Sequence, residues 1–262
     1  MKNIAYSISD KKVFYSVLAN KLLMQRCFHY GDLIVGDLTL CDAESHHLRD
    51  VIRIRIGDEI AVLNGAGKIG VGIIKFFDRK SVIVGINKVV LCGKRQLQIS
   101  LVQAALLNNN NDFIVREATA IGVSEIIFFE AENSECKLHD KITNKLNRWE
   151  AISVGACKQS GNPFLPKISF CKNFFDFKTD EKFLKLFGGL SQKSKRLGDV
   201  LSENPNARHI YITIGPEGDF SSREYEYMRD NGFLECRLTN NILRSESAAL
   251  YALSIVDHFY NC

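Results

Sequence analysis

The 262-residue sequence predicts two domains of different classes, a small β-barrel over residues 24–93 and an α/β domain over residues 94–262. Two observations support this division. Before Gly93, short runs of β-branched and aromatic residues follow one another closely around one helical stretch, which is typical of a small barrel. After Gly93, apolar strand-like runs alternate with helical stretches, which predicts a parallel sheet covered by helices on both faces.

The elements of the first domain follow from their residue patterns. Residues 1–23 match no strong pattern, and we expect either an extension of unknown use or a start assigned upstream of a true initiator at Met24. Residues 42–53 predict a short helix, because an acidic start is followed by apolar residues three to four apart. Residues 64–68 contain two glycines and predict a hairpin turn. Strands are expected at 33–35, 38–40, 59–63, 69–77 and 81–91.

The second domain reads as a series of strands and helices. The longest predicted helix, over 141–159, carries the only tryptophan, and the helix predicted over 112–121 ends at Gly122. Strands are expected at 98–106, 126–129, 183–187, 209–214 and 234–238, and further helices at 222–231 and 246–260.

Charge and cysteine usage exclude several classes of protein. Residues 1–93 carry 13 basic and 9 acidic side chains, whereas residues 94–262 carry 21 of each, so the whole excess of +4 lies in the first 93 residues. No apolar run reaches the roughly 18–20 residues that cross a bilayer, and we expect a cytoplasmic protein without a membrane partner. The eight cysteines include no CxxC pair, so we expect reduced thiols and no metal site.

Three predicted strands of the second domain end in unusual loops, at 187–190, 214–221 and 238–247. In an open α/β sheet, ligands bind beyond the carboxyl ends of the strands. The second loop combines Gly215 and Gly218, which let the backbone approach a ligand, with Pro216, which stiffens the chain. Ser221 and Glu224 then form a capping-box pattern. The string is equally consistent with a tight turn and a helix cap that bind nothing.

The third loop is apolar where surface loops are normally polar. Ile242 and Leu243 lie between asparagines and Arg244. Two interpretations stay open: the loop is buried around a flat ligand, or both side chains belong to the core beneath the last helix. Arg244 would place a cation beside a ligand at this position.

Two of these stretches resemble the signature motifs of the RsmE family. They are Ile-Gly-Pro-Glu-Gly at 214–218, followed by Phe220, Ser221 and Glu224, and Ile-Leu-Arg-Ser-Glu-Ser-Ala-Ala-Leu at 242–250. Supporting matches lie at 24–28, 46–48, 57–60, 118–124, 148–149 and 159–161. The chain departs from the family pattern at Asp219 and Thr239, where glycine is usual, and at Asn241, where arginine is common.

The resemblance implies a SPOUT-class methyltransferase with a PUA-like barrel and a knotted α/β domain, acting as a homodimer. Members transfer a methyl group from S-adenosylmethionine to N3 of a uridine in 16S ribosomal RNA. Arg244 is then expected to stabilise the anionic uracil as the catalytic residue. Glu217 is expected to anchor its loop rather than accept the proton. The expected cofactor-binding residues are Phe187, Gly188, Gly189, Leu190, Gly215, Pro216, Glu217, Gly218, Leu238, Asn240, Ile242 and Leu243.

The first domain is expected to bring the RNA, within the small ribosomal subunit. Arg26, Arg49, Arg53 and Arg55 are the expected RNA-binding residues, since they lie where the charge excess lies and can contact phosphates. Two alternatives to this function stay open. One is a SPOUT methyltransferase acting on another RNA, and the other is a non-catalytic RNA-binding assembly factor with a degenerate cofactor site.

Overall fold

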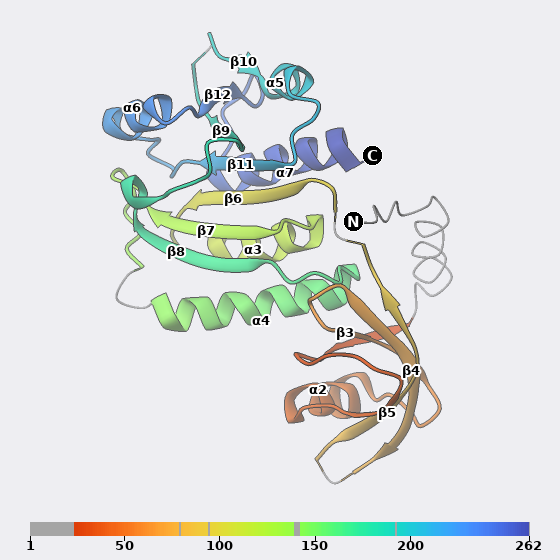
Figure 1. Ribbon diagram of the computed structural model, residues 1–262. Helices are drawn as coiled ribbons and strands as arrows, with labels where there is room; N and C mark the ends of the chain where they lie inside the picture. The colour runs from red at the N-terminus through yellow and green to blue at the C-terminus, as the bar shows by residue number, and fades with distance from the viewer. Residues whose placement is uncertain (1–23, 79, 94, 139–141, 192, 262) are drawn as a thin grey trace. The chain divides into compact units, whose positions relative to one another are not determined.

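The computed structural model describes residues 24–261 except 79, 94, 139–141 and 192 (Figure 1). The expectation for residues 1–23 therefore lies outside the described residues. The chain forms two compact units. The first contains the described residues up to 93 together with Cys157–Leu165, and the second contains Arg95–Ala156 and the chain from Pro166 onward.

The first unit is built on a five-stranded sheet in the order β1-β3-β4-β5-β2. Its strands are β1 (Gln25–Phe28), β2 (Gly36–Thr39), β3 (Glu59–Leu63), β4 (Lys68–Phe77) and β5 (Val82–Leu91). β1 pairs with β3 in parallel, and the other neighbours are antiparallel. The predicted hairpin at 64–68 joins β3 to β4, and the Asn64 carboxamide oxygen accepts the Ala66 and Lys68 amides at 3.0 and 2.9 Å.

The predicted helix over 42–53 is confirmed as two consecutive segments. These are α2 (Asp42–His46) and a π-helical turn, η1 (His47–Ile52), which ends at Arg53 in the left-handed conformation, φ 59°. The fully buried Leu48 anchors this helical region in the core of the unit.

The first strands of the unit differ from the prediction. Residues 33–35 are not a strand: Leu33 is buried, but Ile34 and Val35 are exposed, and pairing with β5 begins only at Gly36. The actual first strand, β1, is too short to show a clear alternation of apolar and polar residues. A strand of four residues cannot be identified from its own sequence pattern, and β1 is identified by its pairing with β3.

The segment Cys157–Leu165 completes the first unit from far along the chain. The Gly67 amide donates to the Pro163 carbonyl at 3.0 Å, and the Leu165 amide donates to the Gly65 carbonyl at 2.9 Å. These backbone bonds dock the segment on the β3–β4 turn. The residue patterns of the first 93 positions carry no sign of this contribution.

The second unit contains a seven-stranded sheet in the order β10-β12-β9-β11-β6-β7-β8. All of its neighbouring strands are parallel, which confirms the predicted parallel sheet. The strands are β6 (Gln98–Ala104), β7 (Glu125–Glu130), β8 (Lys167–Asn173), β9 (Leu184–Gly188), β10 (Lys195–Arg196), β11 (His209–Ile214) and β12 (Leu234–Arg237).

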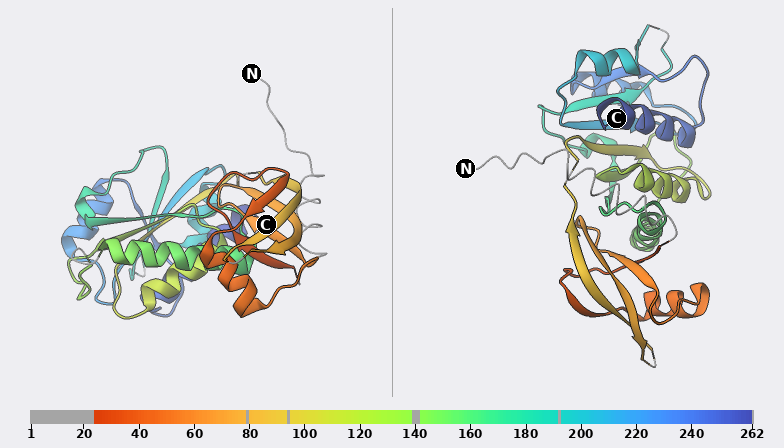
Figure 2. Two further views of the ribbon diagram at one scale, coloured as in Figure 1. Left: turned by 90° about the horizontal axis from the view of Figure 1, so that it is seen from below. Right: turned by 90° about the vertical axis from the view of Figure 1, so that its right-hand side faces the viewer.

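Helices cover both faces of this sheet. One face packs against α3 (Asn110–Ile121), α4 (Ile142–Ser160), α5 (Leu197–Glu203) and α7 (Ser245–Asn261), and Figure 2 shows α3 and α7 on the same side. The other face packs against the 3-10 turn η3 (Phe174–Asp176) and α6 (Ser222–Asp230). Alternation along β6 explains the two layers, because Leu101 points to the first core and Val102 to the second.

Four predicted helices of the second domain, α3, α4, α6 and α7, are confirmed, whereas β8, η3, β10 and α5 were not predicted. β8, β10 and α5 lie in stretches rich in lysine and asparagine, where polar residues obscure the periodicity. Within α3 and α4, Trp149 is fully buried against Phe128, and its indole donates to Asp112 at 3.0 Å. This bond ties the longest helix to the start of α3.

Candidate functional site

The three unusual loops meet at one edge of the second unit's sheet. β9 lies between β12 and β11, and all three are parallel. In the register of the sheet, Phe187 lies beside Thr213 and Gly188 beside Cys236, so the loops after these strands start at the same level. The structure thus brings together the segments at 187–190, 214–221 and 238–247, as expected from a parallel sheet.

Glycine is required at this edge by close packing. A Cβ on Gly188 would lie 3.3 Å from Ile214, and one on Gly215 would lie 3.0 Å from the buried ring of Phe220. A Cβ on Gly189 would overlap the carboxylate of Glu235. Neighbouring side chains therefore pack directly on the main chain of these loops. The loops after β9, β11 and β12 are called the cradle below.

The loop after β11 is held by its own side chains. The Asp219 amide donates to the Pro216 carbonyl at 3.1 Å, and Asp219 adopts φ 62°, in the left-handed region. Its carboxylate accepts the Phe220 amide at 2.8 Å and the Tyr225 hydroxyl at 3.1 Å. The motif that this loop resembles has glycine at this position, whereas the chain has an aspartate whose side chain compensates for the strained backbone.

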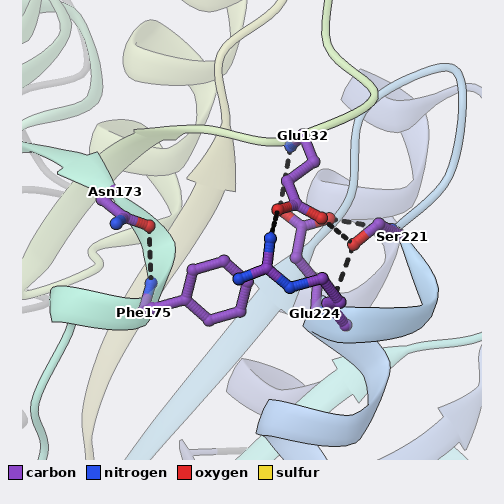
Figure 3. Close-up of polar contacts among 6 residues, drawn as sticks. Glu132, Asn173, Phe175, Ser221 and Glu224 are labelled. Carbon is purple, nitrogen blue, oxygen red and sulfur yellow. Dashed lines mark hydrogen bonds and ion pairs between the residues drawn. The ribbon is translucent and has the colours of Figure 1, made fainter.

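The exit of the loop is fixed by the predicted capping box. The Glu224 amide donates to the Ser221 hydroxyl at 3.1 Å, and the Glu224 carboxylate accepts the Ser221 amide at 2.8 Å (Figure 3). The same carboxylate accepts the Glu132 amide at 3.0 Å. Burial raises the pKa of Glu224. The loop after β11 is thereby joined to the loop after β7.

A second polar network lies behind the cradle, between β6 and α7. The Ser245 hydroxyl donates to the Gly215 carbonyl at 2.5 Å and accepts the Gln103 side-chain amide at 2.9 Å. Gln103 is completely buried, and within the described part of the chain neither its Oε1 atom nor the buried Thr213 hydroxyl has a hydrogen-bond partner. Buried polar groups of this kind are a feature of sites that complete their hydrogen bonds with a ligand.

The third loop is exposed in the absence of a ligand. Ile242 is 81% exposed, so the interpretation that it belongs to the core beneath α7 is wrong for this side chain, and the interpretation that the loop surrounds a ligand stays a prediction. Leu243 is half-buried and Arg244 is exposed, directly before α7. Local bonds shape the turn, since the Asn241 amide donates to the Thr239 hydroxyl at 2.9 Å.

The remaining residues of the expected cofactor site differ in what they present. Phe187 and Pro216 are buried, and the Phe187 ring packs among aromatic side chains of the second core. These two residues can offer only backbone groups to a ligand. Leu238 is half-buried, and the exposed members at this edge are Leu190, Glu217, Gly218 and Asn240.

Arg26 has a structural partner in the first unit. Its guanidinium donates to the carbonyls of Lys158 and Gln159, both at 3.2 Å, at the last turn of α4. A cation at the carboxyl end of a helix satisfies orphan carbonyls and complements the helix dipole. Lys158 in turn pairs with the buried Glu44 at 2.6 Å. Arg26 therefore holds the end of α4, and its contact with RNA stays a prediction.

The other three arginines lie near the helical region of the first unit. Arg49 pairs with Asp50 at 3.1 Å on the surface. Arg53 and Arg55 are exposed, and among the described residues neither guanidinium has a carboxylate partner. Arg53 and Arg55 are thus the two of the four expected residues whose charge is available to a phosphate.

Sequence reasoning missed Gln103, Ser245 and Tyr225. Gln103 and Ser245 carry a signal, because a polar residue inside an apolar strand or at the start of an apolar helix needs a buried partner. Tyr225 carries none, since its role depends on Asp219 reaching it across a turn. Among the described residues, no group of three potential metal ligands is found, and no helix is long and apolar enough to span a membrane.

Comparison with known proteins connects this edge to a family. Residues 93–257 match the RNA methyltransferase domain family, and residues 40–87 match the RNA methyltransferase PUA domain family. The ribosomal RNA small subunit methyltransferase E 2 of Borreliella burgdorferi is 31% identical over 89% of this chain and 94% of its own length. The chain belongs to the ribosomal RNA small subunit methyltransferase E family. Another member, from Bacillus subtilis, is 28% identical over 82% of this chain and 87% of its own length.

Solved structures of methyltransferases agree with the architecture. A methyltransferase from Legionella pneumophila, solved with S-adenosylmethionine, superposes with a TM-score of 0.81 at 27% identity over 90% of this chain and 97% of that one. The methyltransferase E of Neisseria gonorrhoeae, also solved with S-adenosylmethionine, gives 0.82 at 25% identity over 90% and 98%. The predicted RsmE resemblance is confirmed, as are the PUA domain and the α/β class.

Proposed function

We propose that this chain transfers the methyl group of S-adenosylmethionine to N3 of a uridine in 16S ribosomal RNA. The observation that carries the proposal is the convergence of the loops after β9, β11 and β12 on one glycine-lined edge, in a chain of the methyltransferase E family. Relatives of this family are named for the ribosomal small subunit, and two solved ones bind S-adenosylmethionine.

The residues at this edge fit the cofactor. The cradle holds Gly188, Gly189 and Gly215, which carry no side chain that could block a ligand, and the Gln103 Oε1 atom, which has no partner among the described residues, offers a buried acceptor. We assign cofactor binding to the twelve positions expected from the sequence, with Phe187 and Pro216 contributing through their backbone. When bound, S-adenosylmethionine supplies a methyl group already activated by its sulfonium.

The chain's own residues must make the uridine nucleophilic. A neutral imide nitrogen is a poor nucleophile, so N3 has to lose its proton, and a fixed cation stabilises the anionic base. Arg244 carries an exposed guanidinium between the third loop and α7, where it can meet a base held against the cradle. Glu217 is exposed on the neighbouring loop, and we assign it to holding that loop.

The first unit, called the PUA unit because residues 40–87 match the PUA domain family, supplies affinity for the substrate. Arg53 and Arg55 present free charge, while Arg26 and Arg49 contribute from sites where they also bind protein groups. We further propose that the α/β unit carries the trefoil knot of its class and that two copies form a homodimer. The enzyme would act in the cytoplasm on RNA in the small ribosomal subunit.

The test is methyl transfer from labelled S-adenosylmethionine to naked 16S RNA and to small subunits, with the modified nucleoside identified. N3-methyluridine is the expected product. A different nucleoside would overturn the N3 assignment, and transfer only to another RNA would overturn the substrate. Arg244→Ala should bind the cofactor normally by calorimetry while losing turnover; full turnover would refute the role of Arg244.

A further inference from the structure

Two arginines lie side by side at the outer edge of the second unit's sheet. β10 is the edge strand and pairs in parallel with β12 (Figure 1). The register of this pair places Arg196 beside Arg237. Residues paired in register on adjacent strands project from the same face of a sheet. Like charges in such positions repel each other and weaken the pairing. The juxtaposition therefore costs stability unless something relieves it.

Nothing in the described part of the protein relieves this repulsion. Neither guanidinium has a carboxylate oxygen of a described residue within 4.0 Å, although Arg148, Arg223 and Arg229 of the same unit each pair with one. The nearby carboxylates are engaged elsewhere. Glu203 binds Lys195 at 2.6 Å, and Glu235, two positions before Arg237 on its strand, binds Arg229 at 3.3 Å.

Arg196 and Arg237 lie at the carboxyl ends of their strands, which is the end of the sheet that also carries the proposed cofactor-binding loops. Arg237 is the last residue of β12, and the third loop begins at the next position. Arg196 ends β10, which follows the loop after β9. An anion held between these side chains would lie at the carboxyl ends of the same strands that form the cradle.

We propose that Arg196 and Arg237 bind a phosphate of the RNA substrate, as a second RNA contact outside the PUA unit. The inference rests on the proposed function. Paired guanidinium groups present several N–H donors to phosphate oxygens, and an RNA phosphate neutralises the charge that the fold leaves unpaired. Residues 94–262 carry no net charge, so the contact comes from this local pair and not from an overall basic surface.

The experiment measures affinity for a 16S RNA transcript across a range of salt concentrations, using the full chain. Arg196→Gln, Arg237→Gln and the double variant remove the charges. Arg196→Lys with Arg237→Lys restores them without the planar geometry. The matched control is Arg208→Gln, an exposed arginine before the amino end of β11 that is bonded to Gln96 at 3.1 Å. Calorimetry with S-adenosylmethionine is run on every variant.

We expect each glutamine variant to weaken RNA binding and to reduce the slope of log affinity against log salt by about 1 per lost phosphate contact. The double lysine variant should recover the slope, and Arg208→Gln should match the wild type. Cofactor affinity should stay unchanged throughout. Wild-type slope and affinity in the double glutamine variant would overturn the phosphate site, even if the enzyme methylates RNA. Absence of RNA binding by the wild type would overturn both this site and the proposed function.

Discussion

The Tyr225 hydroxyl lies 3.1 Å from each carboxylate oxygen of Asp219, which connects α6 to the loop after β11. The tyrosine ring packs edge-on against Phe187 and Phe220, and these contacts fix the position of its hydroxyl. Burial, together with the charge of Asp219, raises the pKa of Tyr225, which keeps the phenol protonated and able to donate. The carboxylate and the phenol together stabilise a left-handed residue in a loop assigned to the cofactor.

Replacing Asp219 should therefore affect cofactor binding. Asp219→Ala keeps a Cβ at φ 62° but loses the bonds to Phe220 and Tyr225, and we expect a lower melting temperature and weaker binding of S-adenosylmethionine. Asp219→Gly removes the backbone strain and should lie between alanine and wild type. Thermal unfolding and calorimetry measure both. Equal affinity in wild type and Asp219→Ala would contradict the role of this carboxylate.

Ser245 should matter through the Gly215 carbonyl. Ser245→Ala removes the hydroxyl that donates to the Gly215 carbonyl, and a buried unsatisfied group costs about 1–3 kcal/mol. It also removes one of the two acceptors of the Gln103 amide, which keeps the Ala104 carbonyl at 2.9 Å. We expect reduced cofactor affinity as well as reduced stability. Ser247→Ala, an exposed serine of the same helix, is the control. If both variants bind the cofactor equally well, the network does not shape the cradle.

Substitution of Arg26 should lower the stability of the protein, whereas substitution of the exposed arginines of the PUA unit should weaken RNA binding. Arg26→Ala removes two bonds to the end of α4 and should lower the free energy of unfolding by about 1 kcal/mol. Arg53→Ala and Arg55→Ala should unfold like the wild type but bind 16S RNA more weakly and with a smaller salt slope. Urea unfolding and RNA titration measure the two effects. If Arg26→Ala had the same free energy of unfolding as the wild type, the structural role of Arg26 would be refuted.

His209 should make the second unit sensitive to acid. The ring lies 2.8 Å from the Ser100 hydroxyl and stacks on Tyr211, and burial lowers its pKa below the ordinary value of 6.5. The unfolded chain then binds a proton that the folded chain does not, so stability falls as the pH drops below about 6.5. His209→Gln should lose less stability between pH 8 and pH 5 than the wild type. His258→Gln, an exposed histidine on α7, should behave like the wild type.

The alternation of strands and helices predicts the second unit well because its central strands are buried on both faces. β11 and β7 are continuous apolar runs, and their helices end at recognisable signals such as Gly122. β8 and β10 are edge or near-edge segments rich in lysine, so solvent and not a core determines their composition. They form strands because they pair with β7 and β12, and this pairing cannot be read from their own residues.

The candidate site is predictable at the level of loops but not of side chains. The spacing of glycine and proline identifies the loop at Gly215, because these residue types determine the backbone conformation of their own segment. The exposure of Ile242 and the pairing of Arg196 with Arg237 depend on which segments meet in space. The bonds of Arg26 to the end of α4 join positions more than 130 residues apart, and no local pattern encodes them.

Because Cys157–Leu165 belongs physically to the first unit, the PUA unit is not a contiguous stretch of gene. A polypeptide ending at residue 93 would lack the Pro163 carbonyl that Gly67 binds and the helix end that Arg26 caps. Recombination that moved the first third of this chain onto another enzyme would therefore transfer an incomplete module. The two units are constrained to be inherited, exchanged and engineered as one piece.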